Sequence, residues 1–236
     1  MVSRSAVSRV FTPGASVSAK PADKVRRAAD ELGYRPNVLA RSLMTGRSRM
    51  IGLVVAYLDN HFYPGVLERM SNALQARGYH VLVFMTSQDE GNLDRVAEEI
   101  RDYQGDGLSL ASGAMTSDIA ARCRASGVPV VLFNRHQGEE GEIAVVSDNR
   151  AGGRMIADHL VGLGRTRIAH IAGWDGASPQ RDREEGFMEG LAAAGLPLFA
   201  RESGDFRPEE AQAAARRMFS GDARPDALFV SNDYMA

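Results

Sequence analysis

Continuous apolar runs alternate with amphipathic segments from residue 50 onward, and this alternation predicts strands separated by helices. The runs, typical of strands buried on both faces, lie at 51–55, 80–85, 107–110 and 129–133. Apolar positions at helical spacing predict the intervening helices at 63–77, 93–103 and 117–125. Strands and helices in this order favour a parallel, doubly wound α/β sheet.

A second unit repeats the alternation after residues 143–148, which we interpret as the crossing between two lobes. Its expected helices lie at 150–163, 183–194 and 208–219, and its expected strands at 167–172 and 227–230. The chain then ends on Ser231-Asn-Asp-Tyr-Met-Ala, which is typical of the start of another strand–helix unit. We therefore expect a two-lobed core of doubly wound parallel sheets that is incomplete at its C-terminus.

The first 50 residues have a different pattern of hydrophobic and polar positions. Apolar spacing predicts short helices at 5–11 and 20–32, separated by Thr12-Pro-Gly-Ala. In the second helix one face carries the apolar residues Val25, Ala28, Ala29 and Leu32, and Gly33 is the expected C-terminal stop. Residues 35–50 are basic with a small apolar stripe, which suits a linker that folds against a partner.

Charge is distributed unevenly along the chain. Residues 1–50 hold ten Lys/Arg and three Asp/Glu, a net of +7, whereas residues 51–236 hold eighteen and twenty-seven, a net of −9. A small basic module on an acidic body indicates binding to a polyanion such as nucleic acid. A basic tail that is simply solvated would have the same charge, so it remains an alternative.

Composition limits the class of protein. The chain is 44% hydrophobic and 25% charged, as in ordinary globular domains, and no apolar run is long enough to span a membrane. Cys123 is the only cysteine, so an intrachain disulfide or a cysteine metal cluster is excluded. Because the N-terminus also lacks a secretion signal, we expect a cytoplasmic protein.

Catalytic motifs are not found. The sequence has no Gly-x-Ser-x-Gly elbow, no phosphate loop ending in Gly-Lys-Ser/Thr and no His-Glu-x-x-His. The histidines do not pair at metal-ligand spacing; they are His61, His80, His136, His159 and His170. We therefore expect no catalytic residues, no metal, no cofactor and no enzymatic activity.

Binding fits the sequence better. Polar and aromatic residues follow most of the predicted strands, and ligands of parallel sheets bind at the carboxyl ends of the strands. These segments begin at Asp59, Ala111, Asn134, Asp148, Gly173 and Ser231. Such a set suits a small polar ligand, for example a sugar or nucleoside. Individually, several of these residues are as well explained as helix N-caps.

Several segments, in the right order, resemble the lactose-repressor/galactose-repressor family of transcriptional regulators. The resemblance rests on Val2–Phe11, on Glu31–Leu43 running into Gly46–Val55, on Val146–Gly153 with the segments from His159 and Arg167, and on Asp106-Gly-Leu and Ser231–Ala236. It implies a partial helix-turn-helix domain (1–36), a hinge helix (37–49), and the N-terminal (50–147) and partial C-terminal (148–236) lobes of an effector-binding domain. This core is of the type I periplasmic-binding-protein kind.

For DNA, the resemblance makes residues 2–11 the recognition helix. It implies base or phosphate contacts from Arg4, Ser5 and Arg9, and phosphate contacts from Ser8 and Thr12. Asn37 and Arg41 match the hinge helix, and Leu43 matches a leucine that family members wedge between base steps.

For the effector, the resemblance implies a site at or beside Phe62, Tyr63, Asp148, Arg183, Phe229, Asn232 and Asp233. Arg183 is the leading candidate, because a guanidinium presents a rigid fork of donors. The implied partners are a palindromic operator, a sugar-like effector and, in the intact protein, a second copy. Family members begin with a helix that precedes Met1 here, so we expect truncation at both ends. A periplasmic-type sugar-binding protein and a non-functional fragment of a regulator are the alternatives.

Overall fold

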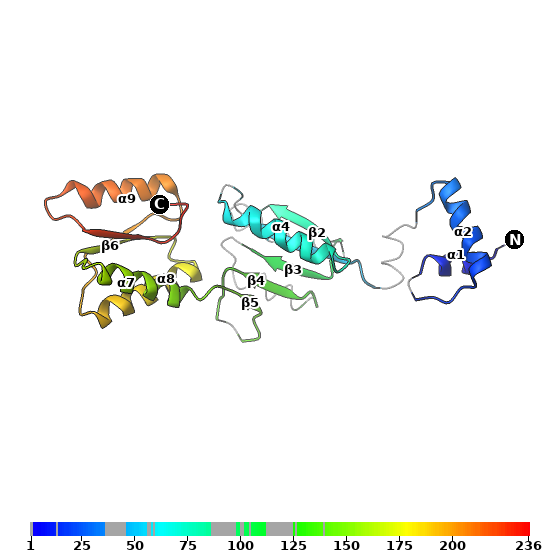
Figure 1. Ribbon diagram of the computed structural model, residues 1–236, viewed down its shortest axis with the longest axis horizontal. Helices are drawn as coiled ribbons and strands as arrows, with labels where there is room; N and C mark the ends of the chain where they lie inside the picture. The colour runs from blue at the N-terminus through cyan, green and yellow to red at the C-terminus, as the bar shows by residue number, and fades with distance from the viewer. Residues whose placement is uncertain are drawn as a thin grey trace. The chain divides into compact units, whose positions relative to one another are not determined.

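The computed structural model describes residues 2–12, 14–35, 46–55, 58, 60–85, 98–99, 102–103, 105–111, 125, 127–138 and 140–236. It divides into two compact units, Met1–Ser48 and Arg49–Ala236 (Figure 1). Among the helices of these residues, none is both long and apolar enough to cross a membrane.

The described residues of the first unit form helices α1 (Arg4–Val10) and α2 (Ala19–Glu31), as the sequence predicts. The N-cap of α1 is Ser3, whose hydroxyl oxygen accepts a hydrogen bond from the Ala6 amide at 3.3 Å. After α2, Gly33 adopts a φ of 59°, the left-handed conformation that favours glycine at a helix end.

The predicted apolar face of α2 is only partly right. Val25 and Ala29 are buried, but they are joined by Ala22, whereas Ala28 is exposed and Leu32 is 81% exposed. The partner helix α1 is only seven residues long, so it covers a narrow stripe of α2 rather than the full apolar face.

Within the described residues, the first sheet of the second unit has five parallel strands in the order β2-β1-β3-β4-β5. They are β1 (Met50–Val55), β2 (His80–Met85), β3 (Gly107–Leu110), β4 (Val130–Phe133) and β5 (Ala144–Val145). Successive residues of β1 pack on opposite faces. Val54 joins Leu108 and Leu110 on one face, and Leu53 and Val55 join residues of α4 (Phe62–Gln75) on the other. This strand order is doubly wound, as the sequence predicts.

Two differences concern the predicted elements of this sheet. Residues 144–145, expected only as a crossing, form the edge strand β5 beside β4, with Leu132 paired to Ala144. The helices expected at 93–103 and 117–125 fall largely outside the described residues.

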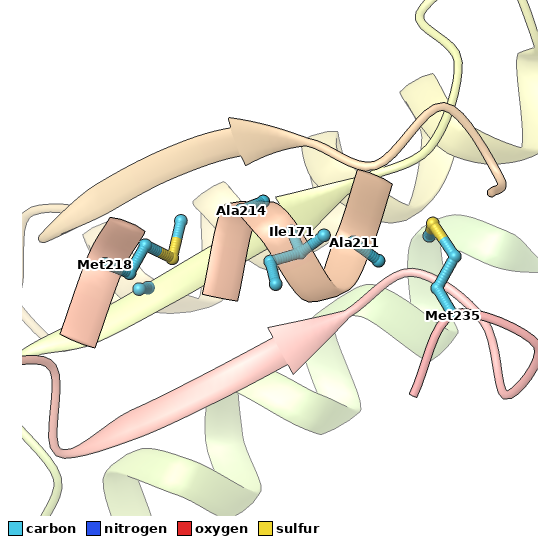
Figure 2. Packing of buried hydrophobic residues seen from close by; sticks show 6 residues of the cluster. Ile171, Ala211, Ala214, Met218 and Met235 are labelled. Atoms are coloured by element: carbon cyan, nitrogen blue, oxygen red, sulfur yellow. The ribbon is translucent and has the colours of Figure 1, made fainter. Parts of the chain in front are cut away.

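The second sheet has three parallel strands in the order β7-β6-β8, namely β6 (Ile168–Ala172), β7 (Ala200–Ser203) and β8 (Ala227–Val230). Helices α7 (Asn149–Gly162) and α8 (Ser178–Ala193) cover one face, and α9 (Pro208–Ser220) covers the other (Figure 1). Figure 2 shows the core under α9, where Ile171 lies among Ala211, Ala214, Met218 and Met235.

Two elements of this lobe differ from those predicted from the sequence. Helix α8 starts at Ser178, five residues before the predicted start, with Pro179 in its first turn, where the missing N–H costs nothing. Strand β7 was not predicted, because Ala-Arg-Glu-Ser has no apolar run; it lies at the sheet edge, where one side needs no strand partner.

Glycines bring α7 and α8 into backbone contact. A Cβ atom on Gly153 would lie 2.0 Å from the Arg183 carbonyl oxygen, and one on Gly186 would lie 1.8 Å from that of Arg150. A Cβ on Gly190 would lie 2.5 Å from the Ala157 methyl group. Only glycine permits this approach, which sets the N-terminal turn of α7 beside Arg183.

Candidate functional site

Arg183 is held between three elements at the carboxyl end of the second sheet. Its Nε donates a hydrogen bond to Asn149 Oδ1 at 2.9 Å, and its Nη1 donates to the Ser231 carbonyl oxygen at 2.8 Å. Asn149 starts α7, and Ser231 directly follows β8. The guanidinium is thus anchored at two nitrogens beside the point where the strand order reverses, which is where open α/β sheets bind ligands.

The surroundings of Arg183 combine burial with nearby acidic groups. Burial lowers the pKa of Arg183, while Tyr63, Asp233 and Asp182 act in the opposite direction. Arginine stays protonated despite such a shift, so a partly buried positive charge faces this region. A ligand that accepts hydrogen bonds would be favoured there.

A second contact joins the loop after β4 to the start of α8. The His136 ring, through Nε2, lies 2.9 Å from Asp182 Oδ2, and its backbone N–H donates to Ser178 Oγ at 2.8 Å. The loop after β4 therefore contacts α8 at Asp182, which directly precedes Arg183 in the chain. Sequence reasoning treated His136 as an isolated histidine, because the partner is 46 residues away in the chain.

The predicted effector residues are only partly assembled. Tyr63 and Asp233 act to raise the pKa of Arg183, as described above. Phe62, which is 46% exposed, stacks on Phe133 with ring centroids 6.2 Å apart. These residues, at the N-terminus of α4, at the end of β4 and after β8, supply aromatic and polar surface at the strand ends.

Three predicted effector residues have visible structural roles. The Phe229 ring is only 8% exposed and stacks on His170 at 4.7 Å, within a core cluster that includes Phe187. Asn232 Oδ1 accepts a hydrogen bond from the Met235 amide at 3.0 Å. Asp148 caps α7, since its Oδ1 accepts from the Ala151 amide at 2.9 Å. In this conformation the Phe229 ring contributes to packing.

The cap at Asp148 yields a measurable prediction. Asp148→Ala should lower the free energy of unfolding by about 1 kcal/mol, because an amide of the first turn of α7 loses its partner. Asp148→Asn should keep most of that stability, because its side-chain oxygen also accepts. Thermal unfolding of the two variants tests this, and equal losses in both would contradict a capping role. A sugar affinity that falls in Asp148→Asn while the stability is kept would indicate a ligand contact as well as the cap.

The residues expected to contact DNA lie on one exposed surface of the first unit. Those that the structure describes are all exposed: Arg4, Ser5, Ser8, Arg9 and Thr12. Thr12 Oγ1 donates to the Ser8 carbonyl oxygen at 2.9 Å, which fixes the end of α1. On the other side of α1, Val7 and Val10 are half-buried. Asn37, Arg41 and Leu43 lie outside the described residues.

Comparison with known proteins places this geometry in a family. Residues 48–236 match the model described as periplasmic binding proteins and sugar binding domain of LacI family. The chain belongs to the LacI family. The ribose operon repressor of Escherichia coli K12 is 32% identical over 241 residues, an alignment that covers all of this chain and 72% of the repressor. The predicted family is confirmed, and the relatives are transcriptional regulators.

Solved LacI-family structures agree. A crystal structure of the lac repressor dimer bound to operator and the anti-inducer ONPF superposes with a TM-score of 0.89 at 26% identity, covering 100% of this chain and 72% of that one. The transcriptional regulator CelR in complex with cellobiose has a TM-score of 0.73 at 30% identity, covering 99% and 72%. The predicted two-lobed, periplasmic-binding-protein-like α/β fold is confirmed.

The structure also gives roles to polar residues that were not named as effector contacts. Asn149 and Ser231 lie in the polar segments that follow the predicted strands and anchor Arg183, although only their neighbours were named as effector contacts. Gln180 is fully buried and hydrogen-bonded to the segments that follow β6 and β8. Its sequence context, just ahead of the predicted helix start, carries no signal for such a role.

Proposed function

We propose that this LacI-family regulator represses transcription from a palindromic operator and that a sugar, with ribose the first candidate, controls its DNA affinity. Ribose comes first because the matched relative from Escherichia coli is a ribose operon repressor. The proposal is a regulator rather than an enzyme or an exported binding protein. Because its partner is chromosomal DNA, the proposed location is the cytoplasm.

The observation that carries the effector half is the anchoring of Arg183. Two of its nitrogens already donate hydrogen bonds to the protein, and these bonds fix the orientation of the remaining N–H donors of the guanidinium. Sugars offer hydroxyl groups that accept such hydrogen bonds, and Tyr63 and Phe62 supply aromatic surface from the N-terminus of α4. Asp148, Asn232 and Asp233 remain candidate sugar contacts, while Phe229 would support the site from the core.

The DNA half rests on the exposed face of α1 and on the net charge of +7 in residues 1–50. Arg4 and Arg9 suit the guanine edge or phosphates, and Ser5, Ser8 and Thr12 suit phosphate oxygens. Residues 37–49, with Asn37, Arg41 and Leu43, would form the hinge. A homodimer would place two copies of α1 one DNA turn apart.

Sugar and operator would be coupled through the angle between the lobes. A sugar held from both sheets would change that angle and shift the two hinges of the dimer together or apart. By linkage, the sugar would then change operator affinity by the same factor as the operator changes sugar affinity.

The test is fluorescence anisotropy of the chain with a labelled palindromic operator pool, at about 50 and 200 mM salt. The proposal expects selection of particular sequences and a change in their affinity when D-ribose is added, with other pentoses and cellobiose in parallel. Only weak, salt-sensitive binding to every sequence would contradict the DNA half. Selective operator binding that no sugar alters would contradict the effector half.

A further inference from the structure

Gln180 makes a set of hydrogen bonds that leaves its amide only one orientation. Its Oε1 accepts from the Gly173 backbone N–H at 2.7 Å and from the Ser231 hydroxyl at 2.5 Å. Its Nε2 donates to Glu184 Oε2 at 2.9 Å. A backbone N–H can only donate and an ionised carboxylate can only accept, so a flipped amide would face two like partners.

Glu184 is kept ionised to receive that bond. Burial acts to raise the pKa of Glu184, but the hydrogen bonds and charge of Arg201 outweigh burial, and the pKa is lowered. Arg201 donates to both Glu184 oxygens, at 2.6 and 2.9 Å, and also pairs with Asp175. Gln180 Nε2 therefore donates to a Glu184 carboxylate whose position is fixed by Arg201.

His170 completes the network beside Gln180. It is fully buried, and its Nδ1 lies 3.1 Å from the Phe229 carbonyl oxygen, which can only accept, so Nδ1 carries the proton. Burial lowers the pKa of His170, which keeps the ring neutral and Nε2 an acceptor. Nε2 lies 3.4 Å from Gln180 Nε2 and 3.5 Å from Ser231 Oγ.

The network reaches Arg183 through a single residue. Ser231 donates its hydroxyl to Gln180, and its carbonyl oxygen accepts from Arg183 Nη1 at 2.8 Å. Gln180 therefore ties together the segment after β6, at Gly173, and the segment after β8, at Ser231. These two segments flank the strand-order reversal of the second sheet.

We propose that Gln180 is a positioning residue for effector binding, which holds the Ser231 carbonyl group where it orients the Arg183 guanidinium. The inference rests on the proposed function in so far as Arg183 binds the effector. Gln180 itself lies at zero exposure, so it acts through Ser231 and Arg183 without touching the ligand.

The experiment compares Gln180→Leu, Gln180→Glu and Arg183→Ala in the full chain, with Gln212→Leu as the matched control. Gln212 is an exposed residue of α9 whose side chain accepts a hydrogen bond from Arg216 at 3.3 Å. Two quantities are measured: D-ribose affinity by calorimetry, and the exchange rate with solvent of the Arg183 Nη–H groups, one of which binds the Ser231 carbonyl oxygen, by NMR without ligand.

In Gln180→Leu we expect ribose affinity to fall about tenfold, because the carbonyl anchor of a charged donor is lost. The Arg183 Nη–H groups should exchange faster in the same variant, because the bond from Nη1 to the Ser231 carbonyl oxygen is weakened, while Gln212→Leu leaves both quantities unchanged. An unchanged exchange rate in Gln180→Leu would overturn the inference, whether or not ribose binds.

Gln180→Glu supplies a readout that a purely structural role would not move. The introduced carboxyl group faces Glu184, so its pKa should rise, and protonation at lower pH restores a donor. The other charged or titratable groups around it are His170, Arg183, Arg201 and Asp175. Ribose affinity of this variant should recover toward the parent as pH falls from 8 to about 5.5, relative to the parent at each pH. A pH-independent deficit would count against positioning.

The two proposals fail in different ways. If Arg183→Ala binds ribose as the parent does, or the parent does not bind it, the effector assignment fails, and the Arg183 exchange rate still decides the role of Gln180. If Arg183→Ala loses ribose while Gln180→Leu retains full affinity and slow exchange, the proposed function stands and the positioning role is wrong.

Discussion

Gly153→Ala is expected to lower the free energy of unfolding by about 3 kcal/mol, the upper end of the usual range for overpacking. The added methyl group would meet the Arg183 carbonyl oxygen at 2.0 Å and the Phe187 amide nitrogen at 2.8 Å. Both atoms belong to the α8 backbone, so no side chain can turn away to make room. The helices would have to separate, which would disturb the core around Phe187 and Leu191.

Gly152 is the matched control, because it lies next to Gly153 in α7 and a Cβ atom there would meet nothing within 4 Å. Gly152→Ala should raise stability by about 0.5–1 kcal/mol through the higher helix propensity of alanine. Urea unfolding followed by circular dichroism measures both variants. Equal effects of the two substitutions would contradict the backbone contact between α7 and α8.

Arg183→Ala is expected to weaken sugar binding about 100-fold, because truncating one member of a desolvated charged hydrogen-bond set costs about 2–5 kcal/mol. Arg183→Lys should not restore affinity, since a lysine ammonium cannot hold Asn149 and the Ser231 carbonyl group while presenting further donors in one plane. Calorimetric titration with D-ribose, or with the sugar that alters operator binding, measures the change.

Arg181 provides the control for Arg183. It lies two residues away in α8, it is exposed, and its Nη1 donates to the Gly176 carbonyl oxygen at 3.3 Å. Arg181→Ala should leave sugar affinity within about twofold, consistent with the small effect of most surface substitutions. Full sugar affinity in Arg183→Ala, with unfolding temperatures matching the parent, would remove Arg183 from the site.

Much of the fold was predictable from the residues alone. Strands β2, β3 and β8 have the predicted bounds, and β1, β4 and β6 differ by one residue at their starts. Apolar runs of four to six residues are typical of strands buried on both faces of a parallel sheet, so these strands could be predicted from neighbouring residues in the chain. Family membership was equally local, since it was carried by ordered motifs such as the one from Glu31 to Leu43.

The candidate site was only partly predictable. Arg183 was singled out by the family resemblance, but its anchors, Asn149 and Ser231, lie 34 and 48 residues away. Phe229 illustrates the reverse case: its position beside the site was expected, yet its stacking on His170 and its tilted contact with Phe187 make its ring part of the core.

The sequence by itself determined the strand–helix alternation, the basic first unit and the family, because each depends on near neighbours in the chain. Tertiary structure decided the edge strand β7, the early start of α8, the glycine contact between α7 and α8, and the network around Gln180. Each of these depends on partners brought together by the sheet, and a polar side chain such as Gln180 is acceptable at zero exposure only when those partners satisfy it.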